Sequence, residues 1–478
     1  MAALKKLQRD ISLARSYEQW LAIASEIDLH NGSCEWRADN ESDLFHSSLL
    51  QNHIVQLQSA LEAEDTSALM SLITESLYRH LSEISNPQLY QIALCGTKEV
   101  ISRYLETVCT AIDYLSDADV PGVPIREKLK KFEQAYHNYG RSALVLSGGA
   151  AFGIYHLGVV KALWQQRLLP NILSGSSMGS IVAAGICARS DEELDEFFKH
   201  PERIHRQALR KAPLKTAIKT GFIMDAGGLY EHILHNVGDV TFAEAYARSG
   251  RVLNITVSPT RANQKPRVLS HLTAPDVIIP HAALASCAIP GVFPPVSLRA
   301  RNEKGDDIPY METEKWIDGS VHSDVPLLRI SRLHNVNHTI VSQANPHVLP
   351  FITHRNKRGL LPFTKRFISS VIHAQSTEVL EVARDLMQNS SWRPLIDKAY
   401  GMARQTYLGD INIHLPFHLP LYTKVAANPD LDGLLHYIHL GEQATWPRMA
   451  EIRDQTRVGL TLRNTVEKLR RKAAAQEG

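Results

Sequence analysis

The chain has 478 residues, of which 44% are hydrophobic and 21% are charged, a composition typical of a globular protein with a sizeable core. Its formal net charge of +2 at pH 7 argues against nucleic acid as a main partner. The five cysteines are scattered and odd in number, which argues against a disulfide framework and indicates a reducing compartment. No HExxH motif and no zinc-ligand spacing occurs, so we expect no metal site.

Residues 1–139 are predicted to be helical throughout and to form a first domain. Between Ile101 and Leu115, apolar residues recur at spacings of three and four, which is the period of one helix face. Lysines at positions 5 and 6 interrupt the start of the chain before any apolar segment forms, so we expect no signal peptide. The sequence leaves two roles open for this domain, a packing scaffold or a lid or lipid-surface element.

A glycine-rich turn follows a short apolar run, Ala143–Leu146, and leads into apolar residues at helical spacing. A glycine turn at the start of a helix presents backbone N–H groups, and acyl transfer needs such groups as an oxyanion hole. The candidate donors are Gly148, Gly149 and Ala150. A dinucleotide site would need a second glycine at position 150 and an acidic residue about twenty residues later. Both are missing, so we reject that interpretation.

The pentapeptide Gly175–Gly179 fits Gly-x-Ser-x-Gly, the nucleophile elbow between a strand and a helix. Glycines at positions 175 and 179 remove side chains that would collide in so tight a turn, and Ser177 is the candidate nucleophile. The motif alone is common by chance. The glycine-rich turn in the preceding strand–helix unit strengthens the catalytic interpretation of this motif. The first unit then offers backbone N–H groups for an anion, and the second offers a nucleophile.

Residues 140–350 are predicted to form the catalytic domain. Val252–Val257 and His338–Ser342 are expected to be further strands, and Gly227–Leu229 a loop within a helical insertion. Asp318 follows the apolar pair Trp316-Ile317 and precedes a glycine. This places an aspartate at the end of a strand, where α/β enzymes hold catalytic groups, although Asp-Gly turns are otherwise common in structural roles.

Residues 351–478 are predicted to be a mostly helical extension with one strand near 405–413. It carries two basic clusters, one within 354–366 and one at 468–472. A further series of basic residues lies in the insertion between positions 199 and 219. Each cluster is either a solvated face or a contact with anionic lipid headgroups. We find no apolar stretch long and regular enough to span a bilayer.

Together, the glycine turn, the elbow and the Trp-Ile-Asp-Gly segment resemble the patatin-like phospholipase family. The segment Ser286–Pro295 is similar to that family's proline-rich stretch before the aspartate. Several longer stretches, among them LTAPDVIIPHAALASCAIPGVF and NVNHTIVSQANPHV, resemble its storage-type triacylglycerol lipases, which carry a helical N-terminal domain of unknown function. The resemblance implies an α/β fold, a three-layer sandwich with a mainly parallel central sheet, and a Ser–Asp dyad without a catalytic histidine.

The resemblance assigns Ser177 as the nucleophile and Asp318 as the general base of this dyad. Three positions depart from the family's usual pattern. Ala150 stands where glycine is common, Phe152 where arginine or lysine is usual, and Ser320 where glycine or alanine is commoner. The first and third are small residues and keep the backbone accessible. Phe152 removes a charge near the site, which favours a less polar substrate such as a neutral glyceride.

The expected function is therefore a serine lipid acyl hydrolase that cleaves fatty-acyl esters of glycerolipids, of triacylglycerol lipase or phospholipase type, with no cofactor. Two alternatives stay open: an α/β-hydrolase with a Ser–Asp–His triad that uses His322 or a later histidine, and a catalytically silent lipid-binding scaffold. We expect His156 to be a packing residue. The expected location is cytoplasmic, with peripheral attachment to a membrane or lipid-droplet surface. The sequence ranks neither the glycerolipid substrates nor the oligomeric states.

Overall fold

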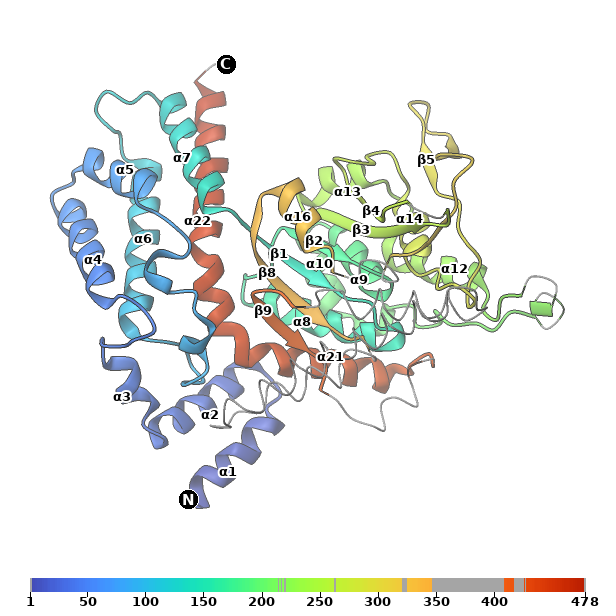
Figure 1. The fold of residues 1–478 in the computed structure, drawn as a ribbon, viewed down its shortest axis with the longest axis horizontal. Coiled ribbons are helices and arrows are strands. Elements are labelled where there is room, and N and C mark those ends of the chain that lie inside the picture. The colour runs from blue at the N-terminus through green and yellow to red at the C-terminus, as the bar shows by residue number, and fades with distance from the viewer. Residues whose placement is uncertain are drawn as a thin grey trace, which may run out of the picture.

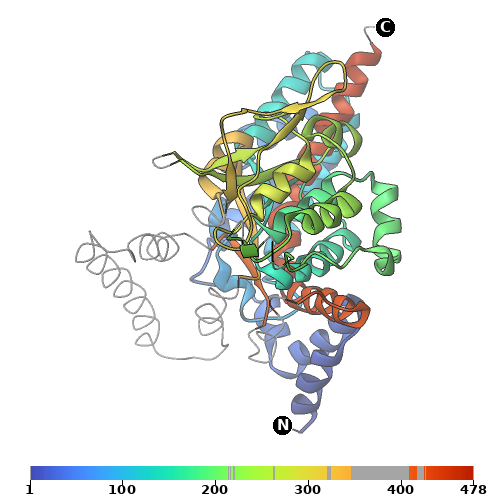
Figure 2. The same cartoon turned by 90° about the vertical axis from the view of Figure 1, so that its right-hand side faces the viewer.

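Figure 1 shows a helical part and a sheet-containing part lying side by side in the computed structural model. The structure describes residues 2–213, 215, 217–218, 221–261, 264–319, 325–345, 408–416, 425 and 427–476. The two ends of the described chain lie at opposite ends of the molecule, as the side view in Figure 2 also shows.

The helical part is built mainly from the first 139 residues, as predicted. Its helices are α1 (Ala2–Asp10), α2 (Tyr17–His30), α3 (Ser33–Ala38), α4 (Ser47–Glu62), α5 (Thr66–Glu75), α6 (Glu99–Asp117) and α7 (Ile125–Tyr139). The 3-and-4 spacing noted in the sequence lies on α6, whose Ile101, Leu105, Val108 and Ile112 are all buried.

The central sheet has the strand order β4-β3-β2-β1-β8-β9, with β7 paired to β3 off this path. The strands are β1 (Arg141–Leu146), β2 (Ile172–Gly175), β3 (Val252–Pro259), β4 (Arg267–Leu269), β7 (Trp316–Asp318), β8 (Val336–Gln343) and β9 (Ile411–His414). Pairs along β3-β2-β1-β8-β9 are parallel, while β4 and β7 run antiparallel to β3. A two-stranded ribbon of β5 (Arg299–Arg301) and β6 (Asp307–Pro309) lies apart from this sheet. The prediction of a mainly parallel sheet is confirmed.

Helices cover both faces of the sheet, because successive side chains of a strand point to opposite faces. On β1, Leu144 and Leu146 join the larger core, and Ala143 and Val145 join a smaller one that includes Ile330. The larger core is completed mainly by α8 (Tyr155–Gln165), α9 (Met178–Cys187), α12 (Ala226–Val237), α14 (Ile279–Ser286) and α21 (Leu431–Thr445). The smaller core is covered by α16 (Leu327–His334). Two shorter helices, α10 (Asp191–Lys199) and α13 (Phe242–Ser249), flank this part.

The helix α22 (Met449–Ala475) follows α21 and packs along α6 and α7 of the helical part (Figure 1). Its Val458, Leu462, Val466 and Leu469 are buried in the core that α4 to α7 form. The helical part is therefore completed by a segment more than 300 residues later in the chain. We propose a domain boundary at residue 139, as predicted, with α22 from the later part of the chain packed against the first domain. The predicted boundary at residue 350 lies outside the described residues.

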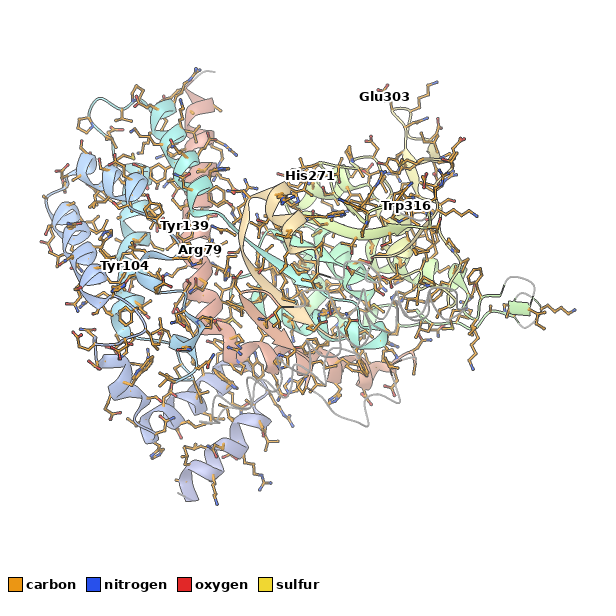
Figure 3. The ribbon with its side chains drawn as sticks, in the orientation of Figure 1. Arg79, Tyr104, Tyr139, His271, Glu303 and Trp316 are labelled. Carbon is orange, nitrogen blue, oxygen red and sulfur yellow. The ribbon has the colours of Figure 1, made fainter. Side chains whose placement is uncertain are left out.

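One guanidinium joins three parts of the molecule, and Figure 3 shows Arg79 beside Tyr139 between the helices and the sheet. Arg79 is 3% exposed and donates hydrogen bonds to the carbonyl oxygens of Tyr139 (3.3 Å), Gly140 (3.1 Å) and Gln455. These carbonyls belong to the end of α7, the start of β1 and α22.

The prediction of a loop at Gly227–Leu229 is wrong. These residues form the first turn of α12, because the carboxylate of Asp225 caps the helix and accepts hydrogen bonds from the backbone N–H groups of Gly227 (2.9 Å) and Gly228 (3.2 Å). Such a cap offsets the low helix propensity of the two glycines.

Candidate active site

Ser177 sits on a strained turn between β2 and α9. Its backbone angles are φ 50° and ψ −128°, a combination that costs a residue with a side chain about 1–3 kcal/mol. The turn is closed around it, since a Cβ on Gly179 would lie 2.4 Å from the carbonyl oxygen of Leu146. A Cβ on Gly175 would likewise lie 2.3 Å from the carbonyl oxygen of Gly179. This close approach explains why the turn has glycine at both positions.

Hydrogen bonds from three directions hold the elbow. The backbone N–H of Ser177 donates to the hydroxyl of Ser286 at 3.0 Å. Its carbonyl oxygen accepts from the N–H (2.8 Å) and the hydroxyl (2.6 Å) of Ser180. The backbone N–H of Ser176 donates to the carbonyl oxygen of Leu146 at 3.2 Å. Ser177 is 7% exposed, so the strained turn holds the candidate nucleophile just below the surface.

Asp318 lies at the end of β7 and is 1% exposed. Its backbone N–H donates to the carbonyl oxygen of Ala288 at 3.0 Å, and its pairing partner on β3 is Val257. Ser286 and Ala288, which hold Ser177 and Asp318 respectively, are separated by one residue. The segment similar to the family's proline-rich stretch therefore links the two candidate catalytic residues.

Cys287, between those two anchors, lies against both candidates. Burial raises the pKa of its thiol, the charge of Asp318 raises it further, and hydrogen bonding with the side chains of Ser177 and Ser180 lowers it. These effects agree with the backbone hydrogen bonds, which hold Ser177 and Asp318 to the residues on either side of Cys287. No motif singles out Cys287, because its position between the two candidate residues depends on the tertiary structure.

The glycine-rich turn begins where β1 ends and packs onto the elbow. A Cβ on Gly153 would lie 2.4 Å from Cγ of Met178, the residue after the nucleophile. Ala150 has φ 48°, a left-handed conformation that only a small part of residues other than glycine adopts. Later amides of the turn are already used, since Ala151 donates to the carbonyl oxygen of Val425 and Phe152 to that of Gly149. The three predicted oxyanion donors precede them.

His156, on α8, supports the glycine-rich turn from below. It is fully buried, and its Nε2 donates to the carbonyl oxygen of Ser147 (3.0 Å) while Nδ1 accepts from the hydroxyl of Ser342 (2.7 Å). Burial lowers the pKa of this imidazole to about 4. A neutral ring with both nitrogens engaged inside the protein is a poor general base at neutral pH. The rival histidine, His322, and the departure at Ser320 lie outside the described residues.

A mainly apolar cavity of about 60 Å³ lies beside the elbow, along α9. One face of this helix lines it with Met178, Ile181, Val182 and Gly185, and Ala151 of the glycine-rich turn borders it. The other lining residues are Ile154, Leu157, Phe197, Ile204, His205, Arg206, Ala208, Leu209, His232, Asn236, Ala427, Asn428, Pro429 and Leu434. Met178 and Gly185 are seven residue steps apart, or about 10 Å, so this face runs from beside the nucleophile to a polar far end near Asn236.

Phe152 does not line this cavity. Its ring is fully buried and lies 6.2 Å from that of Tyr437, measured between centroids. Packing against α21 accounts for the apolar residue at this position. The presence of Phe152 where the family usually has arginine or lysine therefore carries no information about the substrate, contrary to the expectation from the sequence.

The basic clusters have different surroundings. In the last cluster, Lys468 and Lys472 form ion pairs with Asp117 (2.6 and 2.9 Å), so they hold α22 against α6. In the insertion, Arg210 pairs with Glu231 at 3.4 Å, while Lys211 and Lys215 are exposed. The cluster within 354–366 lies outside the described residues.

Within the described ranges, no group of three histidine, cysteine or acidic side chains is arranged to hold a metal ion. Across the same residues, no helix has both the length and the apolar character needed to cross a bilayer.

Comparison with known proteins finds two families along the chain. Residues 144–329 match the family described as patatin-like phospholipase, and residues 2–137 match a domain of unknown function, DUF3336. Triacylglycerol lipase SDP1L of Arabidopsis thaliana is 32% identical over 97% of this chain and 58% of its own length. Triacylglycerol lipase 5 of Saccharomyces cerevisiae is 32% identical over 92% of this chain and 62% of its own length.

A shorter relative matches from end to end. Triacylglycerol lipase ptl3 of Schizosaccharomyces pombe is 30% identical, and the match covers 96% of each chain. The chain thus spans about three fifths of the first two relatives and nearly all of the third.

Proposed function

Because the chain belongs to the patatin-like phospholipase family, we propose that it is a serine lipid acyl hydrolase that cleaves fatty-acyl esters of glycerolipids. The observation that carries the proposal is that the backbone N–H groups of Ser177 and Asp318 are bonded to Ser286 and Ala288, two residues apart, beside a glycine-rich turn. Three relatives are named triacylglycerol lipases, and on that ground we propose triacylglycerol as the preferred substrate.

In the proposed reaction, Asp318 accepts the hydroxyl proton of Ser177, whose oxygen attacks the ester carbonyl. The backbone N–H groups of Gly148, Gly149 and Ala150 stabilise the oxyanion, and losing one such donor typically costs about 3 kcal/mol of transition-state stabilisation. The alcohol leaves with the proton from Asp318, and an acyl-enzyme remains. Asp318 then takes a proton from water, whose oxygen attacks the acyl carbon. The bond to Ser177 breaks, the serine oxygen regains the proton from Asp318, and the fatty acid is released.

The cavity along α9 suits the acyl chain of such a substrate. Met178, directly after the nucleophile, lines one end of it, so the cavity borders the elbow. Apolar lining stabilises the chain by about 25 cal/mol per Å² removed from water. No cofactor takes part in the proposed steps.

We also propose a cytoplasmic enzyme that attaches to lipid surfaces from outside. All five cysteines are free thiols, which supports a reducing compartment. A water-insoluble glyceride is reached only at the surface of a membrane or droplet, which supports the peripheral attachment.

A fluorophosphonate probe and a lipid panel test the proposed function. The wild type should be labelled and should hydrolyse triacylglycerol faster than phospholipid or lysophospholipid. Ser177→Ala should lose labelling and hydrolysis together. Asp318→Asn keeps the shape of the side chain and removes the basic oxygen, so turnover should fall by roughly 10²- to 10⁴-fold.

The matched control is Asp432→Asn, the same substitution at an exposed position in the first turn of α21, which should leave turnover unchanged. An unlabelled wild type that still binds lipid would identify a silent scaffold instead. Wild-type turnover in Asp318→Asn would remove the aspartate from the mechanism.

A further inference from the structure

A hairpin projects from the body of the molecule next to the proposed acyl cavity. Its two sides are residues 210–212 and 223–225, and we call residues 210–225 the hairpin arm. The backbone N–H of Asp225 donates to the carbonyl oxygen of Arg210 (2.8 Å), and that of Ala212 donates to that of Ile223 (2.9 Å). Figure 1 shows the arm extending to the right, beyond α12.

The arm combines positive charge with exposed apolar side chains. Positions 211–224 read KAPLKTAIKTGFIM, which contains three lysines and no acidic residue. Ile218 is 77% exposed and Ile223 is 62% exposed. Single exposed apolar residues are ordinary, but two of them on a projecting basic element form the combination found where proteins insert into the boundary between headgroups and acyl chains.

The base of the arm is attached to the proposed active site on two sides. On one side, Ala208 and Leu209 line the acyl cavity immediately before the arm begins. On the other, the backbone N–H of Met224 donates to the carbonyl oxygen of Val292 at 3.2 Å. Val292 belongs to the same segment that holds Ser177 through Ser286. A surface touching the arm is therefore next to the cavity and the elbow.

We propose that the hairpin arm docks the protein onto an anionic phospholipid surface, with Ile218 and Ile223 inserted below the headgroups and Lys211 and Lys215 at headgroup level. The lysines fit a negative surface, because positions 211–224 contain no acidic residue and Asp225, at the base of the arm, lies 3.9 Å from Arg210. The inference rests on the proposed function, since a lipid surface is where its substrate is found. Docking through the arm presents the cavity directly to that surface.

Vesicle flotation tests the proposal in the full chain carrying Ser177→Ala, so that no lipid is consumed. The vesicles are phosphatidylcholine, with or without phosphatidylserine. Ile218→Ser with Ile223→Ser should weaken binding to both kinds at least about tenfold, because apolar burial is lost. Lys211→Gln with Lys215→Gln should weaken binding roughly thirtyfold to the anionic vesicles only, and should flatten its salt dependence.

The control is Leu328→Ser, at a side chain that is 75% exposed on α16, away from the arm. It should leave binding unchanged. Equal binding by all variants, no binding by any protein, or an equal loss in the control would overturn the proposal.

A second measurement separates this inference from the proposed function. Hydrolysis of a soluble p-nitrophenyl ester, measured with Ser177 intact, should be the same in the arm variants and the wild type. Vesicle binding that depends on the arm in a protein without esterase activity would keep the docking and refute the function. Esterase activity together with vesicle binding that does not depend on the arm would support the proposed function and overturn the docking proposal.

Discussion

Replacing His156 with alanine should destabilise the protein while leaving the chemical step largely intact. The side chain is fully buried and makes two hydrogen bonds, to the carbonyl oxygen of Ser147 and to the hydroxyl of Ser342. In a triad, a histidine beside the site would be the base. In the proposed dyad, His156 is a positioning residue that holds the turn before Gly148.

The expected loss of unfolding free energy follows from the carbonyl of Ser147 and the hydroxyl of Ser342, which the substitution leaves without the imidazole in a buried site. An unsatisfied buried group costs about 1–3 kcal/mol, so two groups give about 3 kcal/mol when a water molecule partly replaces the ring. Ser342→Ala removes one partner and should cost about 1 kcal/mol.

The difference in unfolding free energy between the wild type and His156→Ala should also decrease as the pH falls. Burial holds the pKa of His156 at about 4, against 6.5 for the free side chain. Below pH 6.5 the unfolded chain binds a proton that the folded state does not, so acid removes stability from the wild type and not from the variant. The wild type loses about 1.4 kcal/mol of stability relative to the variant for each pH unit between 6.5 and 4. The two proteins should therefore approach equal stability near pH 4 to 5.

Urea unfolding between pH 4.5 and 8 measures the stability of the wild type and both variants. Turnover of a p-nitrophenyl ester is measured at a temperature where all are folded, and should stay within about tenfold of wild type. A stable His156→Ala protein whose turnover falls as far as that of Asp318→Asn would refute the reasoning, and would show that this histidine takes part in the chemistry.

Three other predictions follow from buried features. Gly185→Leu should fill the far end of the acyl cavity, where a Cβ has ordinary room, and lower hydrolysis of a palmitoyl ester at least about tenfold relative to a butyryl ester. Arg79→Met removes a buried donor, but the carbonyl of Tyr139 keeps the amide of Asn337 (2.8 Å) and that of Gln455 lies within α22. The free energy of unfolding should therefore fall by about 1–3 kcal/mol, measured in urea at pH 7. The pKa values of His232 and His334 are also lowered to about 4 by burial, so together with His156 they should make the melting temperature fall steeply between pH 6.5 and 4, and a flat profile there would contradict their burial as neutral groups.

The sequence was most informative where local chemistry decides the conformation. The apolar run before Gly148 and the Gly-x-Ser-x-Gly pattern predicted two strand–turn–helix units, and both are present at those residues. The resemblance to the patatin-like family is confirmed by the match over residues 144–329. The roles of Ser177 and Asp318 stay predictions, although the structure places both beside one thiol.

The sequence was least informative where distant segments meet. Nothing local indicates that β7 pairs with β3, that Cys287 joins the two candidate residues, or that Phe152 belongs to the core. The prediction at Gly227 is wrong for a local reason, because the side chain of Asp225 caps α12 and outweighs the two adjacent glycines. Side-chain burial and long-range pairing depend on the whole fold, which spacing along the chain does not record.

The packing of α22 against α6 and α7 has a consequence for the order of folding. Val458, Leu462, Val466 and Leu469 belong to a core whose other buried members are in the first 139 residues, so during synthesis that core is incomplete until α22 has emerged. Closing so long a loop costs little extra free energy but delays the contact. The N-terminal helices must therefore wait, with apolar surface exposed, while the sheet forms. A nascent chain of this architecture would need protection of α4 to α7 until α22 has been synthesised.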